Sequence, residues 1–134
     1  MSQENVEVVR EILTGFATTH RAVARLTTPD SVWDMGTFRG WPDVPEYVGP
    51  DAFNEFFAKW TGPYEDWEMD VEDLRDIDDD RVLAIMTQRG RLRETDDWVE
   101  MRFGLILTVI EGLVSHTEAF ATCAEALEAA GLRE

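Results

Sequence analysis

Apolar positions in the N-terminal half of the chain follow a helical period. Over residues 6–20 they recur every three or four positions, which predicts one amphipathic helix of about four turns. A shorter helical stretch is expected over residues 20–26. Phenylalanine and tryptophan then fall at i, i+3, i+4 and i+7 within residues 53–60, so a second helix with a wide aromatic face is predicted to end at Gly62.

Other segments have the pattern of strands and loops. β-Branched and aromatic residues over 32–38 predict a strand, and the Gly- and Pro-rich residues 39–50 that follow are expected to form a loop. Apolar and acidic residues alternate over 67–72, which is typical of a strand with one solvated face. This strand is predicted to be the first of four consecutive strands.

The last three of these strands are predicted to be antiparallel neighbours. Residues 81–93 and 98–110 are long apolar-rich stretches, and Glu111-Gly112 after them is expected to form a two-residue hairpin turn. Thr122 and Glu125 then match a capping box, which predicts a closing helix over residues 123–130.

Composition places the chain among single globular domains. It has 134 residues, of which 44% are apolar and 30% charged, so we expect one domain over residues 1–134 that buries a core unaided. The lone Cys123 excludes an internal disulfide. Because the first residues also lack the pattern of a signal peptide, the expected location is the cytoplasm.

The net charge of the chain limits the classes of partner that we expect it to bind. Twenty-eight acidic residues against twelve lysines and arginines give a net charge of −16, which repels phosphate backbones and anionic lipids. The longest apolar run, residues 103–110, is also too short to span a membrane. We therefore expect neither nucleic acid nor a membrane as a partner.

Four short segments are similar to those of a known family. They are residues 29–34 (Pro-Asp-Ser-Val-Trp-Asp), 49–53 (Gly-Pro-Asp-Ala-Phe), 89–91 (Arg-Gly-Arg) and 124–132 at the C-terminal end. On these segments the chain resembles the SnoaL-like branch of the nuclear transport factor 2-like superfamily over nearly its whole length. The resemblance implies an α+β fold in which a curved antiparallel sheet wraps around helices as a cone with an internal pocket, and frequent dimers across the sheet.

The family includes polyketide cyclases, ketosteroid isomerases and limonene epoxide hydrolases, so the fold by itself does not choose a function. Three departures from these enzymes weaken a direct transfer of mechanism, and one is Arg89, which stands at what resembles the position of an epoxide-hydrolase aspartate. Ala119 stands where the cyclases and epoxide hydrolases have an acid, and Gly104 stands where the isomerases have one.

Two faces can be assigned to the strands on either side of the Glu111-Gly112 turn. One face carries Phe103, Leu105, Leu107, Val109, Val114, His116, Glu118 and Phe120; the other carries Arg102, Gly104, Ile106, Thr108, Ser115, Thr117, Ala119 and Ala121. Hydrophobicity alone places the first face under the helices, whereas the resemblance places the second in the pocket. We adopt the second assignment. It predicts a homodimer through an outer face that includes Phe103, Leu105, Leu107, His116, Glu118 and Phe120.

Three charged residues are the candidate catalytic group. Arg89 and Arg102 are expected to oppose each other inside the pocket, with Asp34 as their acceptor. The resemblance to the isomerases gives Asp34 the role of general base, while the arginines would stabilise negative charge. A structural carboxylate that neutralises an arginine is the equal alternative. The residues expected to line the pocket are Phe16, His20, Phe53, Phe57, Trp60, Ile85, Thr87, Ile106 and Thr117.

Two functions therefore stay open. One is a cyclase- or isomerase-type enzyme without a metal or an organic cofactor, and the other is a non-catalytic protein that binds a hydrophobic carboxylate or ketone. His116 and Glu118 are too few ligands for a closed metal site, so we expect a polar spot in an interface there. The two arginines predict that the pocket prefers acids to amines.

Overall fold

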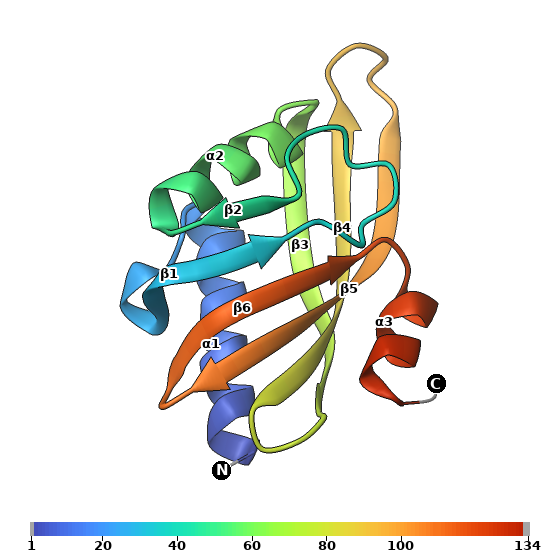
Figure 1. The fold of residues 1–134 in the computed structure, drawn as a ribbon. Coiled ribbons are helices and arrows are strands. Elements are labelled where there is room, and N and C mark those ends of the chain that lie inside the picture. The colour runs from blue at the N-terminus through green and yellow to red at the C-terminus, as the bar shows by residue number, and fades with distance from the viewer. Residues whose placement is uncertain (1, 133–134) are drawn as a thin grey trace.

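The helices and strands alternate irregularly along the chain, as expected for an α+β protein. The computed structural model describes residues 2–132 (Figure 1). Its elements are α1 (Ser2–Thr19), the 3-10 helix η1 (Ala24–Leu26), β1 (Thr27–Asp34), β2 (Glu46–Val48), α2 (Pro50–Thr61), β3 (Tyr64–Asp76), β4 (Arg81–Leu92), β5 (Trp98–Ile110), β6 (Leu113–Phe120) and α3 (Cys123–Ala130).

Most of the expected elements are confirmed, and the differences have local causes. The stretch 20–26 is helical only in η1, because His20 adopts a left-handed conformation (φ 61°) that ends α1. The segment expected to be a loop contains β2, whose three residues pair with the end of β1 and are too few to show a period in the sequence. The capping box is confirmed: the Glu125 amide donates to the Thr122 hydroxyl at 3.1 Å.

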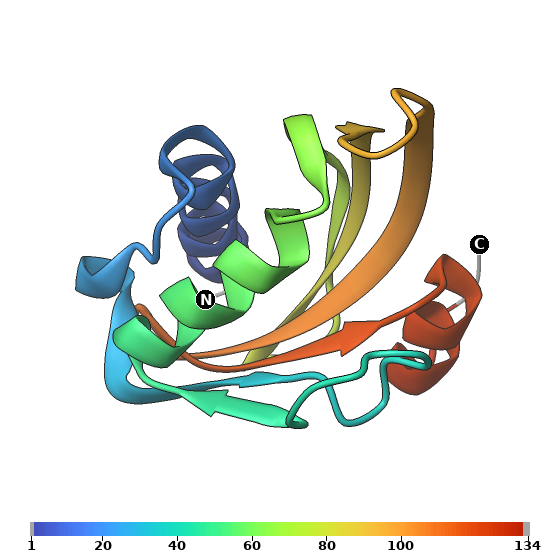
Figure 2. The same ribbon diagram turned by 90° about the horizontal axis from the view of Figure 1, so that it is seen from above.

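The strands form one curved, unclosed sheet in the order β2-β1-β6-β5-β4-β3. Every neighbouring pair is antiparallel except β1 and β6, which are parallel. Figure 2 shows α1 and α2 on the concave side of the sheet and α3 on the outer side. The cone-like fold implied by the resemblance is therefore confirmed.

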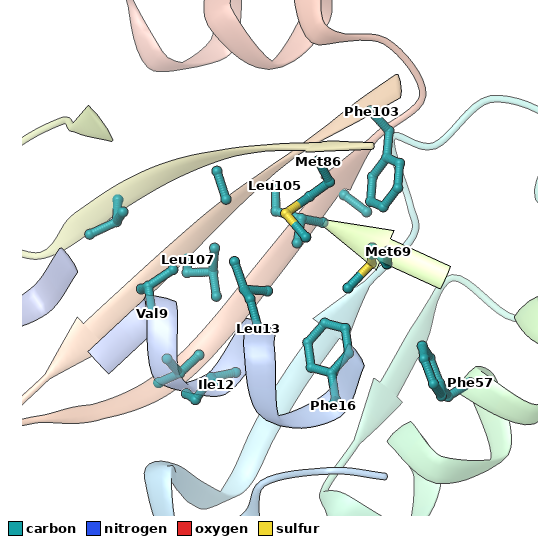
Figure 3. Close-up of a cluster of buried hydrophobic side chains, with 14 of the residues drawn as sticks. Val9, Ile12, Leu13, Phe16, Phe57, Met69, Met86, Phe103, Leu105 and Leu107 are labelled. Carbon is teal, nitrogen blue, oxygen red and sulfur yellow. The ribbon is translucent and has the colours of Figure 1, made fainter. Parts of the chain in front are cut away.

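The main core lies between α1 and the concave face of the sheet. Val9, Ile12, Leu13 and Phe16 form the apolar stripe of α1, and Figure 3 shows this stripe facing Met86, Leu105 and Leu107. Burial of such side chains contributes about 1.5–3 kcal/mol each, so this contact is a main source of stability.

The adopted face assignment is wrong for β5. Phe103, Leu105 and Leu107 are 4%, 0% and 1% exposed and pack in the core, so they are not available on the outer face. The reason is a bulge in β6: Val109 pairs with Val114, but Thr108 pairs with His116, which leaves Ser115 as an extra residue.

The bulge also explains why two residues of β6, Thr117 and Ala119, do lie on the pocket side as expected. Beyond it, Thr117 pairs with Leu107 and Ala119 pairs with Leu105, so these two small residues share the concave face with the large residues of β5. Each of the two expected faces therefore mixes inner and outer residues. Hydrophobicity alone gives the correct face for β5.

Helix α3 covers part of the outer face that was expected to hold a dimer interface. It encloses Leu83, Ile85, Ile106 and Phe120 in a second core. Gly104 lies directly below it: a Cβ atom at this position would come within 2.3 Å of the Ala126 Cβ atom. The glycine thus permits close packing of the helix, and the homodimer stays a prediction that needs other contact residues.

Two general features of the described part are relevant to function. No helix within residues 2–132 is both long and apolar enough to cross a membrane. Over the same residues, no group of three or more histidine, cysteine, aspartate or glutamate side chains is arranged to hold a metal ion.

Candidate functional site

The structure does not bring the three candidate catalytic residues together. Asp34 lies at the end of β1, where its carboxylate accepts from the Gly36 amide at 2.7 Å and lies 3.3 Å from Nε2 of His116. Arg89 and Arg102 are on β4 and β5, and β6 separates these strands from β1. A shared acid–base site of Asp34 with the two arginines is therefore not formed.

Both arginines lie on the outer face, with partners of their own. Arg102 binds Glu72 at 2.7 Å, and Arg89 lies 3.5 Å from Glu68 with its guanidinium 4.6 Å from the centre of the Trp98 ring. The hydrogen bonds from Arg102 and Thr87 lower the pKa of Glu72. The expectation that these arginines face the pocket is wrong, because residues 102 and 103 alternate across β5 and the large Phe103 occupies the inside.

Three expected lining residues are also on the outer face. The Thr87 hydroxyl donates to Glu72 at 2.9 Å, and Ile85 and Ile106 pack under α3. The expectation that they line the pocket is wrong for the same reason as for the arginines, because paired residues of β4 and β5 point to the same face of the sheet. Thr87 pairs directly with Arg102.

The other expected lining residues do lie on the concave side. Phe16, Phe53 and Thr117 border a cavity of about 50 Å³ between α1, β1 and α2. Phe57 and Trp60 border a gap of only about 10 Å³ beside it. His20 packs edge-on against the rings of Phe57 and Trp67, with centroids 5.8 and 5.2 Å apart. Aromatic rings thus fill most of the interior of the cone.

A larger space opens at the rim of the cone, and we call it the rim groove. It is lined by residues of the rim loop (residues 35–45, between β1 and β2), of the C-terminal end of α2 and of β3, β4 and β5. Its volume is about 480 Å³, within the usual range of small-molecule sites. The lining residues are Phe38, Trp41, Pro42, Asp43, Lys59, Trp60, Pro63, Tyr64, Gln88 and Met101.

A polar network holds the rim loop against α2 and β2. Oδ2 of Asp43 accepts from Nζ of Lys59 at 2.5 Å and from the Tyr47 hydroxyl at 2.6 Å, and the Trp41 indole donates to that hydroxyl at 3.1 Å. The hydrogen bond from Lys59, followed by that from Tyr47, lowers the pKa of Asp43 to about 2. Burial and the bond to Asp43 raise the pKa of Tyr47.

The other end of the rim loop is attached to α3 and β6. Arg39 forms two hydrogen bonds to the Glu125 carboxylate, at 3.0 and 3.3 Å, and the Thr37 hydroxyl is 3.1 Å from Glu118. The pair with Arg39 lowers the pKa of Glu125. The loop that carries Phe38 and Trp41 is therefore attached near both of its ends.

The floor of the rim groove contains a buried amide that the sequence analysis did not single out. Gln88 on β4 is only 2% exposed, and its Oε1 atom accepts from the indoles of Trp60 and Trp67 at 2.7 and 3.3 Å. The sequence signal for its inner position is the alternation along β4, because Gln88 falls on the same face as the core residues Ala84 and Met86.

A glycine on the same strand makes room for one side of the groove. A Cβ atom at Gly90 would come within 2.5 Å of Cδ1 of Tyr64, so only glycine lets this ring lie over β4. The segment Arg89-Gly90-Arg91 thus places two arginines outside and, on the inner side, a glycine that the Tyr64 ring covers. Arg91 binds Glu65 and Asp66 at 2.9 and 2.8 Å on the outer side.

Comparison with known proteins identifies relatives of the fold. A family of SnoaL-like domains matches residues 9–117. No curated protein matches the chain in sequence.

Three solved structures share the fold over almost the whole chain at low identity. An NTF2-like protein of unknown function from Burkholderia pseudomallei is 16% identical, with a TM-score of 0.73 and coverage of 93% of this chain and 95% of its own. A putative SnoaL-like polyketide cyclase from Jannaschia sp. is 18% identical, with a TM-score of 0.69 and coverage of 96% and 92%. TerC, co-crystallised with polyporic acid, is 16% identical, with a TM-score of 0.72 and coverage of 96% and 98%.

Proposed function

We propose, from the premise that this chain belongs to the SnoaL-like domain family, that it binds a small, largely apolar molecule in the rim groove. The observation that carries the proposal is the groove itself. It offers about 480 Å³ beside half-buried aromatic rings, whereas the interior of the cone offers about 50 Å³. Apolar contact and ring stacking would supply the affinity.

The geometry favours binding over acid–base chemistry. Asp43 is the acidic residue among the described residues that line the groove, and its pKa of about 2 makes it a weak base. Its Oδ2 atom is also engaged by Lys59 and Tyr47. A proton-transfer role for Asp34 has no support from the rim groove, because Asp34 is not among its lining residues.

The charge preference expected from the sequence needs correction. The preference for acids over amines was inferred from Arg89 and Arg102 inside the pocket, and both lie on the outer face with Glu68 and Glu72. In the groove the charge of Lys59 is matched by Asp43 at 2.5 Å. We therefore propose that the walls select for apolar shape rather than for ligand charge.

Binding can be tested with a bicyclic probe and a matched pair of variants. Titration of 1-tetralone into the protein, followed by calorimetry, should show one saturable site. Trp41→Ala removes an indole from the groove and should weaken binding about tenfold or more, the usual effect of losing a large aromatic contact. Trp98→Ala removes an indole that is 50% exposed on the outer face and should leave the affinity unchanged.

Two results would contradict the proposal. One is the absence of saturable binding of 1-tetralone, and of its hydrocarbon analogue tetralin, to the folded protein. The other is an equal loss of affinity in the Trp41 and Trp98 variants, which would place the site away from the rim groove.

A further inference from the structure

We infer that Gln88 is the specificity-determining residue of the rim groove and that its Nε2 amide donates a hydrogen bond to an oxygen acceptor of the ligand. The ligand class is then an apolar ring compound with a carbonyl or carboxylate oxygen. This inference rests on the proposed function, because it concerns the same groove.

The orientation of the amide follows from its neighbours. An indole N–H can only donate, and the indoles of Trp60 and Trp67 both direct their N–H groups at one end of the Gln88 side chain. That end must be the oxygen, so the NH₂ group points the other way. Gln88 is itself one of the residues that line the rim groove.

The NH₂ group has no acceptor of its own within residues 2–132. Both hydrogen bonds of the Gln88 side chain in this range are accepted by its oxygen. In the same range the hydroxyl of Thr28 is the enclosed side-chain polar atom without a partner, and Nε2 of Gln88 is not enclosed in this way. The amide nitrogen is therefore a donor that no group within residues 2–132 satisfies, on a side chain that borders the groove.

The donor is rigid and lies in an apolar setting. The two indoles fix the amide plane, and Trp60 is itself held by ring contacts with Phe38, Trp41 and Phe103. A ligand without an acceptor would cover the N–H group and leave it unpaired, which is unfavourable in a site of low polarity. A ligand with a correctly placed oxygen avoids this loss, and no rearrangement of the protein is needed.

The inference predicts a ratio of affinities between two probes of the same shape. Calorimetry should show 1-tetralone binding about tenfold or more tighter than tetralin, which lacks the oxygen. The carbonyl stretch of bound 1-tetralone should also shift to lower frequency than in an apolar solvent. The second measurement needs no variant.

Gln88→Glu is the most informative substitution, because its carboxylate can still accept from both indoles while the donor is removed. This variant should lose the preference for 1-tetralone and gain affinity for 1-aminotetralin. Gln88→Met, which removes the amide without adding charge, should equalise the affinities of 1-tetralone and tetralin, and it replaces the glutamate variant if that protein does not fold.

The outcomes distinguish a failure of the Gln88 role from a failure of the rim groove as a binding site. Equal affinities of 1-tetralone and tetralin for the wild type, with an unshifted carbonyl stretch, would overturn the role of Gln88 but leave the groove as a binding site. Unchanged selectivity in Gln88→Met would do the same. Failure of every probe to bind would overturn the proposed function itself.

Discussion

Nζ of Lys59 lies 2.5 Å from Oδ2 of Asp43 and joins the C-terminal end of α2 to the rim loop. This contact fixes one side of the rim groove, since Trp41 and Asp43 belong to the same loop. The pKa of Asp43 is lowered to about 2 and that of Lys59 is raised, so the pair stays charged at neutral pH and is broken only in acid or strong base.

The first prediction concerns stability in acid. The pKa of Asp43 in the folded protein is below its ordinary value of 3.8, so its contribution to the free energy of unfolding is complete above about pH 4 and is lost as the pH falls toward 2. Asp43→Asn should therefore melt at a lower temperature than the wild type at pH 5, and the difference should shrink toward pH 2.

Asp70→Asn is the matched control, because Asp70 is exposed on β3. Thermal melts of the three proteins at pH 5, 4, 3 and 2 give the comparison. A difference between the wild type and Asp43→Asn that stays constant over this range would contradict the pairing of Asp43 with Lys59.

The second prediction concerns the packing of α3 on the outer face. Gly104→Ala should lower the free energy of unfolding by about 1–3 kcal/mol, because its Cβ atom would come within 2.3 Å of that of Ala126. Adding Ala126→Gly should recover part of this loss. Chemical denaturation of both single variants and the double variant measures the coupling, and purely additive losses would show that α3 does not rest on Gly104.

The third prediction tests which face of β5 is inside. Leu107→Ala should cost about 2–5 kcal/mol, because Leu107 is 1% exposed beneath α1. Arg102→Met should cost no more than about 1 kcal/mol, since its pair with Glu72 is exposed. A small loss in Leu107→Ala, no greater than that in Arg102→Met, would contradict the placement of Leu107 on the inner face.

The fourth prediction is that the two arginines of the outer face do not contribute to ligand binding. Arg89→Met and Arg102→Met should leave the affinity for 1-tetralone within about twofold of the wild type, because both guanidinium groups pair with glutamates away from the groove. Calorimetric titration of each variant is sufficient. A tenfold loss of affinity in either variant would show that the arginine concerned belongs to the binding site.

The sequence predicted the elements well because their signals are local. The aromatic spacing of residues 53–60 and the capping box at Thr122 each depend on neighbours within one or two turns, and both are confirmed by α2 and α3. The face of β5 could not be predicted from the resemblance, since one extra residue at Ser115 reverses the pairing beyond it. No local pattern in β6 marks this bulge.

The candidate site was predicted less well for a related reason. The rim groove combines residues from the rim loop, α2, β3, β4 and β5, so its lining depends on contacts between distant segments. Of the expected residues, Trp60 lines this groove. Gln88 was missed because a single glutamine in a strand is ordinarily a surface residue; the alternation with Ala84 and Met86 indicates the inner face, but the two indole partners come from distant segments.

The most direct test of ligand binding in the rim groove is NMR of the labelled protein with 1-tetralone. We predict that its protons show nuclear Overhauser effects to the indole rings of Trp41 and Trp60, and that the side-chain NH₂ signals of Gln88 move on binding. Effects confined instead to Thr117 and Phe53 at the interior cavity, or to Arg89 and Arg102 on the outer face, would contradict the account.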